Sequence, residues 1–382
     1  MPSLRGLSLA VSSTLVIGLG VGLAPTAQSV NVLPVDPERR CAWSVVYPLD
    51  ANYAWPDQDA AYINQAVAIG AGEKVVITGR DPRARYWSIT TYNLEDRQVI
   101  DRVNDVTVKR QGKGSSAPWT VTVTAKHNPK DPNSLQAAPL PVPGQPASFK
   151  NVTVVMYRVY LSETSTYAGG SLPTVTLHHA DGTKTRAERL PPCRLDQIKA
   201  PDIPLGLEPA PGVPADAFIR AEGGRFYPSF DTAYLAAEVP YDPAKILVVS
   251  GKAPSFGKAK SADVRYWSLC TNVNAGDLPV VDCASDVDVQ KQQRQDGRYV
   301  FAIVGPGQVP DRSRYPGVTF LDWSTGSASD LPPAFLIMRH ILSNPKFAFS
   351  IDRVKLGDRA SATMGDYAPV IEHLTLEELA SR

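Results

Sequence analysis

One strand-like motif occurs twice in the chain, and this repetition constrains the fold more than any other feature. Arg85–Asn93 has the sequence RYWSITTYN, and Arg265–Asn272 has the sequence RYWSLCTN. Each copy alternates large apolar residues with small polar ones, which is typical of a strand with one buried face. The alternation places Trp87 on the core face and Tyr86 on the opposite face.

The residues around the two motifs keep a matching register. Tyr62 and Tyr234 are 172 positions apart, whereas Trp87 and Trp267 are 180 apart. An insertion around Ser255–Ala262 accounts for the difference of 8. A register maintained over several strand-like runs predicts that the chain contains two copies of one unit.

The composition favours an all-β fold with few short helices. The chain has 382 residues, enough for two domains, and its 34 prolines gather between the strand-like runs, where turns and sheet edges accept them. We therefore expect two tandem, internally duplicated β-sandwich or jelly-roll-like units. The predicted strands are Ala61–Ile69, Lys74–Thr78, Ala84–Asn93, Val106–Lys109, Trp119–Ala125, Val152–Leu161, Thr174–His178, Thr232–Glu238, Ile246–Ser250, Val264–Thr271, Val287–Gln290, Tyr299–Val304 and Phe335–Ile341.

The expected domain order is a signal peptide at 1–27, a first repeat at 41–190, a proline-rich linker at 191–224 and a second repeat with C-terminal helices at 225–382. Ser343–Pro345 is a candidate start for a helix running to Val354. Thr375–Glu378 has the pattern of a capping box.

The N-terminus indicates export. Arg5 precedes an apolar stretch from Leu7 to Leu23, and small residues follow up to Ala27, which predicts a secretory signal peptide cleaved after Ala27. An uncleaved membrane anchor is the alternative interpretation, because the stretch is near the lower limit for spanning a bilayer. We expect the protein to be secreted or to lie in the cell envelope, with no membrane attachment beyond this segment.

Four cysteines in an exported chain favour disulfides. Three pairings are open, and we predict Cys41–Cys193 and Cys270–Cys283, because the second pair fits across a hairpin.

Charge and motifs exclude several classes of function. The formal net charge is +1 with no long run of one sign, so we expect no nucleic acid partner. Nucleophile and phosphate-loop motifs are missing, and we predict no cofactor. His178 and His179 point to opposite faces of a strand, and Asp282, Asp286 and Asp288 resemble a solvated turn more than a calcium loop, so we predict no metal site.

Arginines in apolar strands are the main candidates for a functional role. Arg158 and Arg339 lie at matching points of two such strands, 181 positions apart. Each needs a carboxylate or a wet cleft, and we expect a carboxylate from its own half. We likewise expect structural pairs of Asp59 with Arg85 and of Asp231 with Arg265. If a cleft exists, the residues predicted to line it are Arg158, Arg339, His340, Trp87 and Trp267.

The two motifs, with GGSLPTVTL at 169–177 and MGDYAP at 364–369, resemble the strand signature of a bacterial exported family of unknown function. That family is built from tandem jelly-roll-like sandwiches, so the resemblance implies the fold but no reaction. The favoured hypothesis is a secreted protein that binds a glycan, a lipid or a small molecule in a cleft. The alternative is a secreted hydrolase or lyase whose acid and base come from separate strands. The oligomeric state is not indicated.

Overall fold

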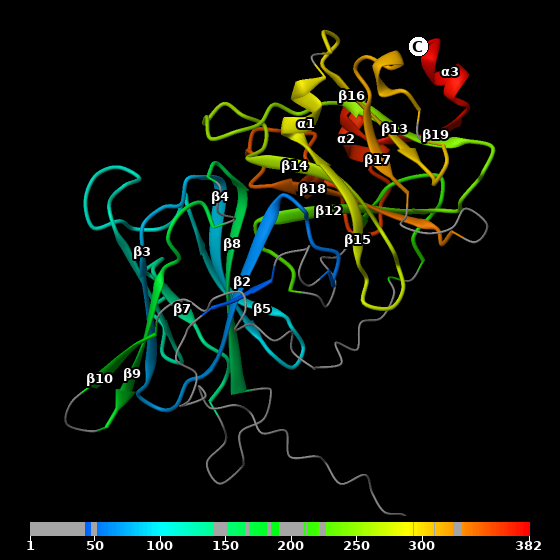
Figure 1. The fold of residues 1–382 in the computed structure, drawn as a ribbon. Helices are drawn as coiled ribbons and strands as arrows, with labels where there is room; N and C mark the ends of the chain where they lie inside the picture. The colour runs from blue at the N-terminus through cyan, green and yellow to red at the C-terminus, as the bar shows by residue number, and fades with distance from the viewer. Residues whose placement is uncertain are drawn as a thin grey trace, which may run out of the picture. The chain divides into compact units, whose positions relative to one another are not determined.

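Short strands make up most of the regular structure, as the alternating sequence predicts (Figure 1). The computed structural model describes residues 43–46, 52–140, 151–164, 168–181, 185–190, 210, 212–221, 227–292, 294–308, 310–323 and 331–382. The predicted signal peptide, Cys41 and Cys193 lie outside these ranges.

Two sheets enclose the first core and form the first sandwich. Their strand orders are β1-β2-β8-β4-β5 and β10-β9-β3-β6-β7. Trp43, Trp87, Trp119 and Tyr157 are the largest side chains of this core. The strands are β1 (Ser44–Val46), β2 (Ala60–Ala68), β3 (Lys74–Gly79), β4 (Ala84–Asn93), β5 (Val99–Asn104), β6 (Trp119–Thr124), β7 (Ser134–Gln136), β8 (Val152–Ser162), β9 (Thr174–Ala180) and β10 (Thr185–Leu190).

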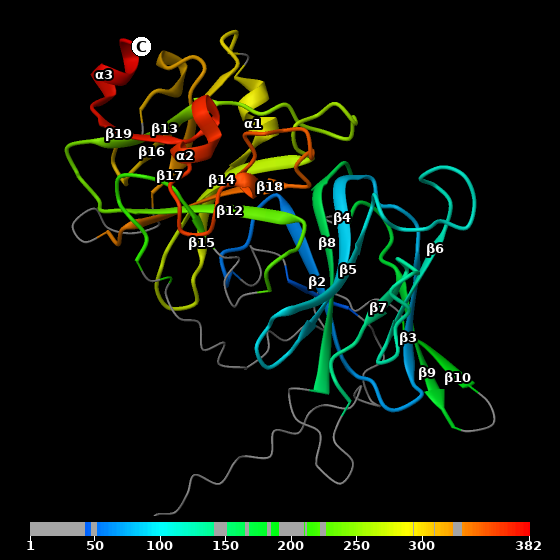
Figure 2. The same cartoon turned by 180° about the vertical axis from the view of Figure 1, so that it is seen from behind.

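The second sandwich has its own core around Trp267, Tyr299 and Phe301. Its sheets have the orders β11-β12-β18-β14-β15 and β17-β16-β13-β19. Figure 2 shows β12, β18 and β14 as neighbours in one layer, with β13, β16 and β19 in the other. The strands are β11 (Ile219–Ala221), β12 (Thr232–Val239), β13 (Ile246–Lys252), β14 (Tyr266–Asn272), β15 (Val280–Ser285), β16 (Arg298–Val304), β17 (Thr319–Asp322), β18 (Ala334–Ile341) and β19 (Val370–Leu374).

One sheet of each sandwich follows the same plan. The order β2-β8-β4-β5 in the first corresponds to β12-β18-β14-β15 in the second. Register agrees as well: Arg158 lies between Tyr62 and Ser88 on the neighbouring strands. Arg339 lies between Tyr234 and Ser268 in the same way.

The predicted assignment of residues to the two faces of β4 is confirmed, but the expectation of one buried face is wrong, because both faces of the strand are buried. Trp87 and Ile89 belong to the first core, and both are almost fully buried. Tyr86 faces the other side of the sheet, where it joins a separate cluster described below. The face of a strand that each residue occupies was therefore predictable from a period of two.

Two predicted strands and one predicted helix are wrong. Val287–Gln290 lies in the helix α1 (Asp286–Lys291), because Ser285 and Asp288 form a capping box there. Residues 106–109 form no strand in the structure, since the Asn104 side chain accepts from the backbone of the residues after it and closes a turn. Between Ser343 and Val354, where a helix was predicted, the structure forms only the 3₁₀ turn η4 (Ile351–Arg353).

The remaining helices are short. The predicted capping box at Thr375 is confirmed at the start of α3 (Leu376–Ala380), where Glu378 is its partner. The other segments are α2 (Ser361–Met364) and the 3₁₀ turns η3 (Arg312–Arg314) and η5 (Gly365–Tyr367). Within the described ranges, no helix has the length and apolar character needed to cross a membrane.

The second sandwich begins earlier than the predicted boundary at 225. Strand β11 starts at Ile219 and pairs with β12. Phe218 is buried in the second core.

Candidate functional site

A cluster of aromatic side chains, which we call the seam, joins strands of the two sandwiches. It contains Tyr86 and Tyr160 from the first sandwich, and Tyr266 and Ile341 from the second. The rings of Tyr160 and Tyr266 meet edge to face, with centroids 5.2 Å apart. The faces of β4 and β14 that point away from the cores thus build the contact between the halves.

The segment 52–59, which we call the first arm, precedes β2 but contacts the second sandwich. Its Asp57 is fully buried and accepts hydrogen bonds from the hydroxyl of Tyr266 at 3.0 Å and from Ser268 at 2.7 Å. The backbone nitrogen of Trp55 donates to the carbonyl of Leu278. These hydrogen bonds to the second sandwich anchor the arm at Asp57.

The second arm, residues 227–231, crosses in the opposite direction. Asp231 accepts a hydrogen bond from the hydroxyl of Tyr86 at 2.8 Å and from Asn104 at 3.0 Å. Arg102 completes the contact with an ion pair at 2.6 Å. Each sandwich therefore receives a carboxylate from the arm of the other, and each carboxylate binds the tyrosine of an RYWS motif.

The two buried arginines hold these arms in place. Arg158 donates to the backbone carbonyl of Tyr227 at 2.5 Å, and Arg339 donates to the carbonyl of Trp55 at 2.6 Å. Trp55 and Tyr227 both have positive φ angles, 50° and 54°. That backbone conformation is uncommon outside glycine, and here a guanidinium fixes it in both arms.

The predicted carboxylate partners from the same half are therefore wrong. Within the described ranges, no carboxylate lies in ion-pair distance of Arg158, which contacts the Tyr92 hydroxyl instead. The guanidinium of Arg339 lies 3.9 Å from Asp57, which belongs to the other half. The expectation failed because the sequence shows which residues of the two halves correspond, but not which half packs against the arginine.

The arginines of the RYWS motifs also pair across the halves. Arg85 contacts Asp286 at 3.1 Å, and Arg265 contacts Asp105 at 2.7 Å. Both carboxylates are more than nine-tenths buried in their side chains. The predicted pairs of Asp59 with Arg85 and of Asp231 with Arg265 are wrong for the same reason.

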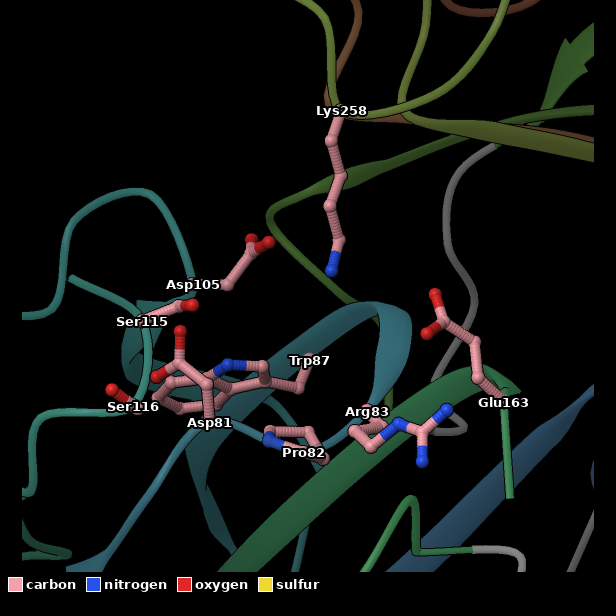
Figure 3. A pocket seen from close by; sticks show the side chains of 9 residues that line it. All are labelled: Asp81, Pro82, Arg83, Trp87, Asp105, Ser115, Ser116, Glu163 and Lys258. Carbon is pink, nitrogen blue, oxygen red and sulfur yellow. The ribbon is translucent and has the colours of Figure 1, made fainter. Parts of the chain in front are cut away.

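A pocket of about 290 Å³ opens beside the Asp105–Arg265 pair (Figure 3). Most of its wall comes from the first sandwich, and Lys258 reaches toward it from the insertion in the second. The lining residues are Asp81, Pro82, Arg83, Trp87, Asp105, Ser115, Ser116, Glu163 and Lys258.

Two carboxylates form one side of the pocket, and each is paired with an arginine. Asp81 contacts Arg110 at 2.5 Å, and Asp105 contacts Arg265 at 2.7 Å. Burial raises the pKa of Asp105 to about 6, although the nearby guanidinium of Arg265 and the ammonium of Lys258 each lower it. Asp105 therefore changes charge near neutral pH.

Two residues that line the pocket each have a buried polar atom without a partner. Within the described part of the chain, no group hydrogen-bonds to Trp87 Nε1 or to Asp105 Oδ1, and both atoms are buried. The Trp87 ring stacks on Trp119 at 4.9 Å, so packing fixes its orientation. The indole nitrogen of Trp267 is also unpaired, so an unpaired indole alone does not identify a site. The combination of a pocket with the unpaired carboxylate oxygen of Asp105 does.

The rim carries charged side chains that are exposed: Arg83, Glu163 and Lys258. The backbones of Arg83 and Glu163 are hydrogen-bonded to each other, and Arg83 also donates its backbone N–H to Gly169. A Cβ at Gly169 would lie 2.8 Å from the Arg83 carbonyl, so this close approach requires glycine. These contacts fix the backbone of the rim at Arg83 and Glu163, whereas the charged side chains of both residues reach solvent.

Of the residues predicted to line a cleft, only Trp87 lies at this pocket. Arg158, Arg339 and Trp267 are buried at the seam or in the second core. His340 is buried too, and its Nδ1 accepts from the backbone of Ile351 at 3.3 Å. Burial lowers the pKa of His340 to about 3, which keeps the ring neutral.

Three residues of the pocket, Asp81, Asp105 and Lys258, were not predicted from the sequence as site residues. A signal for Lys258 was present, because it lies in the insertion that distinguishes the two motif regions. Asp105 follows the end of β5, a strand that was not predicted. Its nearness to Trp87 comes from the pairing of β4 with β5.

Two acidic residues near Asp57, Asp286 and Asp288, already have protein partners. Asp286 contacts Arg85, and Asp288 caps α1. Asp57, Cys270 and Cys283 lie close enough to one another to hold a metal ion, but the two cysteines form a disulfide. The predicted Cys270–Cys283 disulfide is therefore confirmed, and its sulfur atoms are not free to act as thiolate ligands.

Comparison with known proteins supports the fold alone. No family model matches the chain, and no curated protein matches it. It is similar to the crystal structure of an uncharacterised protein from Burkholderia cenocepacia, with a TM-score of 0.50 and 12% identity, over 92% of this chain and 86% of that one. The VPA0106 protein from Vibrio parahaemolyticus gives a TM-score of 0.40 and 14% identity, over 84% and 90% of the two chains.

Proposed function

We propose that the protein binds a small polar molecule in the pocket between Trp87, Asp105 and Lys258. The observation that carries this proposal is that Trp87 and Asp105 line one cavity, and that each has a buried polar atom, Nε1 and Oδ1, without a partner among the described residues. Buried polar atoms without partners are costly, and a ligand that bonds to them recovers that cost. A volume of about 290 Å³ suits a molecule the size of a single sugar.

A thermal-shift panel with a pocket-filling variant tests this function. The panel contains neutral sugars, sugar acids, dicarboxylic acids and amino acids, applied to the mature protein. Ser115 is exposed at the rim, so Ser115→Trp should fill the pocket without disturbing the core, while Ser115→Ala leaves it open. A ligand that raises the melting temperature of the parent and of Ser115→Ala, but not of Ser115→Trp, supports the proposal. If no compound stabilises the parent, or if Ser115→Trp responds like the parent, the proposal is wrong.

A hydrolase is the second candidate, and one observation favours it. Asp81 and Asp105 line the same pocket, and burial raises the pKa of Asp105 to about 6, as in a general acid. Against it, each carboxylate is already neutralised by an arginine, Arg110 or Arg265. Hydrolysis of chromogenic glycosides that is lost in Asp105→Asn would support the hydrolase, and we expect no such turnover.

We further infer that the protein is exported and that its halves are copies of one unit. Export is supported by the apolar stretch from Leu7 to Leu23 and by the Cys270–Cys283 disulfide. Duplication is supported by the equivalent strand orders and by the matching positions of Arg158 and Arg339. Mass spectrometry of the protein from its native host should find Gln28 as the first residue, and an intact Met1 would contradict export with cleavage.

A further inference from the structure

The chemistry of the pocket specifies a class of ligand. We propose that the ligand is a hydroxylated carboxylate, such as a sugar acid, whose hydroxyl groups face Trp87 and Asp105 and whose carboxylate faces Lys258. This inference rests on the proposed binding function and goes further by naming the substrate class. Three parts of the pocket support this ligand class: the floor, the rim and the insertion that carries Lys258.

The floor requires groups that both donate and accept. Trp87 Nε1 is a donor without an acceptor, and Asp105 Oδ1 is an acceptor without a donor. A hydroxyl group meets either need, because it carries one donor hydrogen and two acceptor lone pairs. The second carboxylate oxygen of Asp105 is held by Arg265 at 2.7 Å, so the free oxygen stays in place. Ser116 adds a hydroxyl to the same wall.

The rim favours an anion. Lys258 and Arg83 are exposed cations, and Glu163 is the single exposed carboxylate on the lining. Among the described residues, no hydrogen bond or ion pair engages the side chain of any of the three. The floor carboxylates are each paired with an arginine, and the rim has two cations against the one carboxylate of Glu163, so the rim carries an excess of one positive charge.

Lys258 makes the site depend on both halves. It lies in the insertion that the first RYWS region lacks, and Figure 3 shows its side chain extending toward the space above Trp87 and Asp105. A ligand carboxylate at Lys258 with hydroxyls at Asp105 would bridge the second sandwich to the first. The equivalent region of the first sandwich has no such insertion.

Isothermal titration with three probes tests the ligand class on the full mature chain. The probes are D-glucuronate, neutral D-glucose and cyclohexanecarboxylate, which has the charge but no hydroxyls. We expect D-glucuronate to bind at least about fivefold more tightly than either of the others, which corresponds to about 1 kcal/mol. Its affinity should also fall as salt rises, whereas that of glucose should not.

Two lysine variants locate the carboxylate. Lys258→Gln should weaken D-glucuronate by about fivefold and leave D-glucose unchanged. Lys260→Gln is the matched control, because Lys260 is exposed in the same insertion but does not line the pocket. Both side chains are exposed, so both variants should fold.

The outcomes separate this inference from the proposed function. Equal binding of glucose and glucuronate, or no effect of Lys258→Gln, overturns the ligand class but leaves a binding pocket that Ser115→Trp still blocks. Equal binding of cyclohexanecarboxylate and glucuronate overturns the role of the hydroxyls. If no compound in the wider panel binds, the proposed function fails, and the ligand class fails with it.

Discussion

Arg158 and Tyr227 are 69 positions apart in sequence, and a guanidinium hydrogen bond of 2.5 Å joins them across the seam. Arg339 makes the same contact with Trp55 at 2.6 Å. In each case a strand at the centre of a sheet holds the backbone of an arm from the other half. The two sandwiches are therefore connected by a reciprocal exchange in addition to the aromatic seam.

Replacing either buried arginine should destabilise the whole protein. Arg158→Met leaves the Tyr227 carbonyl and the Tyr92 hydroxyl without this donor, so we expect a loss of about 2–3 kcal/mol in the free energy of unfolding. Arg314→Met, at an exposed arginine, should change it by less than about 0.5 kcal/mol. Urea unfolding measures both, and a parent-like midpoint for Arg158→Met would show that the arm contact contributes nothing.

The crossed ion pairs predict a specific pattern of coupling. A double-mutant cycle of Arg265→Met with Asp105→Asn should give an interaction energy of about 1–3 kcal/mol. The cycle of Arg265→Met with Asp231→Asn should give a much smaller energy, because Asp231 pairs with Arg102 instead. Thermal or urea unfolding provides the four free energies for each cycle. Strong coupling of Arg265 to Asp231 would contradict the crossed pairing and would support an ion pair within the second half.

Stability should fall as pH rises from about 4 to about 7. Burial raises the pKa of Asp59 to about 7, and burial also raises the pKa values of Asp105 and Asp286 to about 6. In this window the folded state holds protons that the unfolded state has released, so increasing pH favours unfolding. Asp59→Asn should therefore raise the melting temperature at pH 8 by a few degrees and leave it nearly unchanged at pH 4. A variant that melts below the parent at pH 8 would contradict this assignment.

Loss of the Cys270–Cys283 disulfide should lower the free energy of unfolding, because the unfolded chain gains conformational entropy. The bond closes a loop of 13 residues, for which loop-closure entropy predicts about 3 kcal/mol. The double variant Cys270→Ser, Cys283→Ser should lower the urea midpoint accordingly, and the parent treated with reductant serves as the comparison. An unchanged midpoint would indicate that the pairing is not formed in solution.

Cys41 and Cys193 remain the predicted partners of a second disulfide. Neither lies in the described ranges, so the pairing rests on the even number of cysteines and on the expected export. Peptide mapping without reduction should recover a peptide pair containing both residues. Free thiols at these two positions would disprove the prediction.

The sequence predicted local structure well because local structure depends on alternation. Trp87 and Tyr86 fall on the expected faces of β4, and the strand limits of β4 match the prediction, Ala84–Asn93. The contacts between the halves were not predictable, because pairing of Arg265 with Asp105 depends on how two sheets face each other. The pocket was found only in part: Trp87 was a candidate, whereas Asp105 joins it through the pairing of β4 with β5.

The crossing of the arms also has a consequence for the order in which the protein matures. A chain is synthesised from its N-terminus, so the first sandwich is complete before Asp231 exists to accept the Tyr86 hydroxyl. Until then its aromatic face is uncovered and prone to association with other chains. The pocket is completed later still, because Lys258 and Arg265 follow Asp231 in the sequence. A nascent chain that stops short of these residues has neither a covered seam nor a complete pocket.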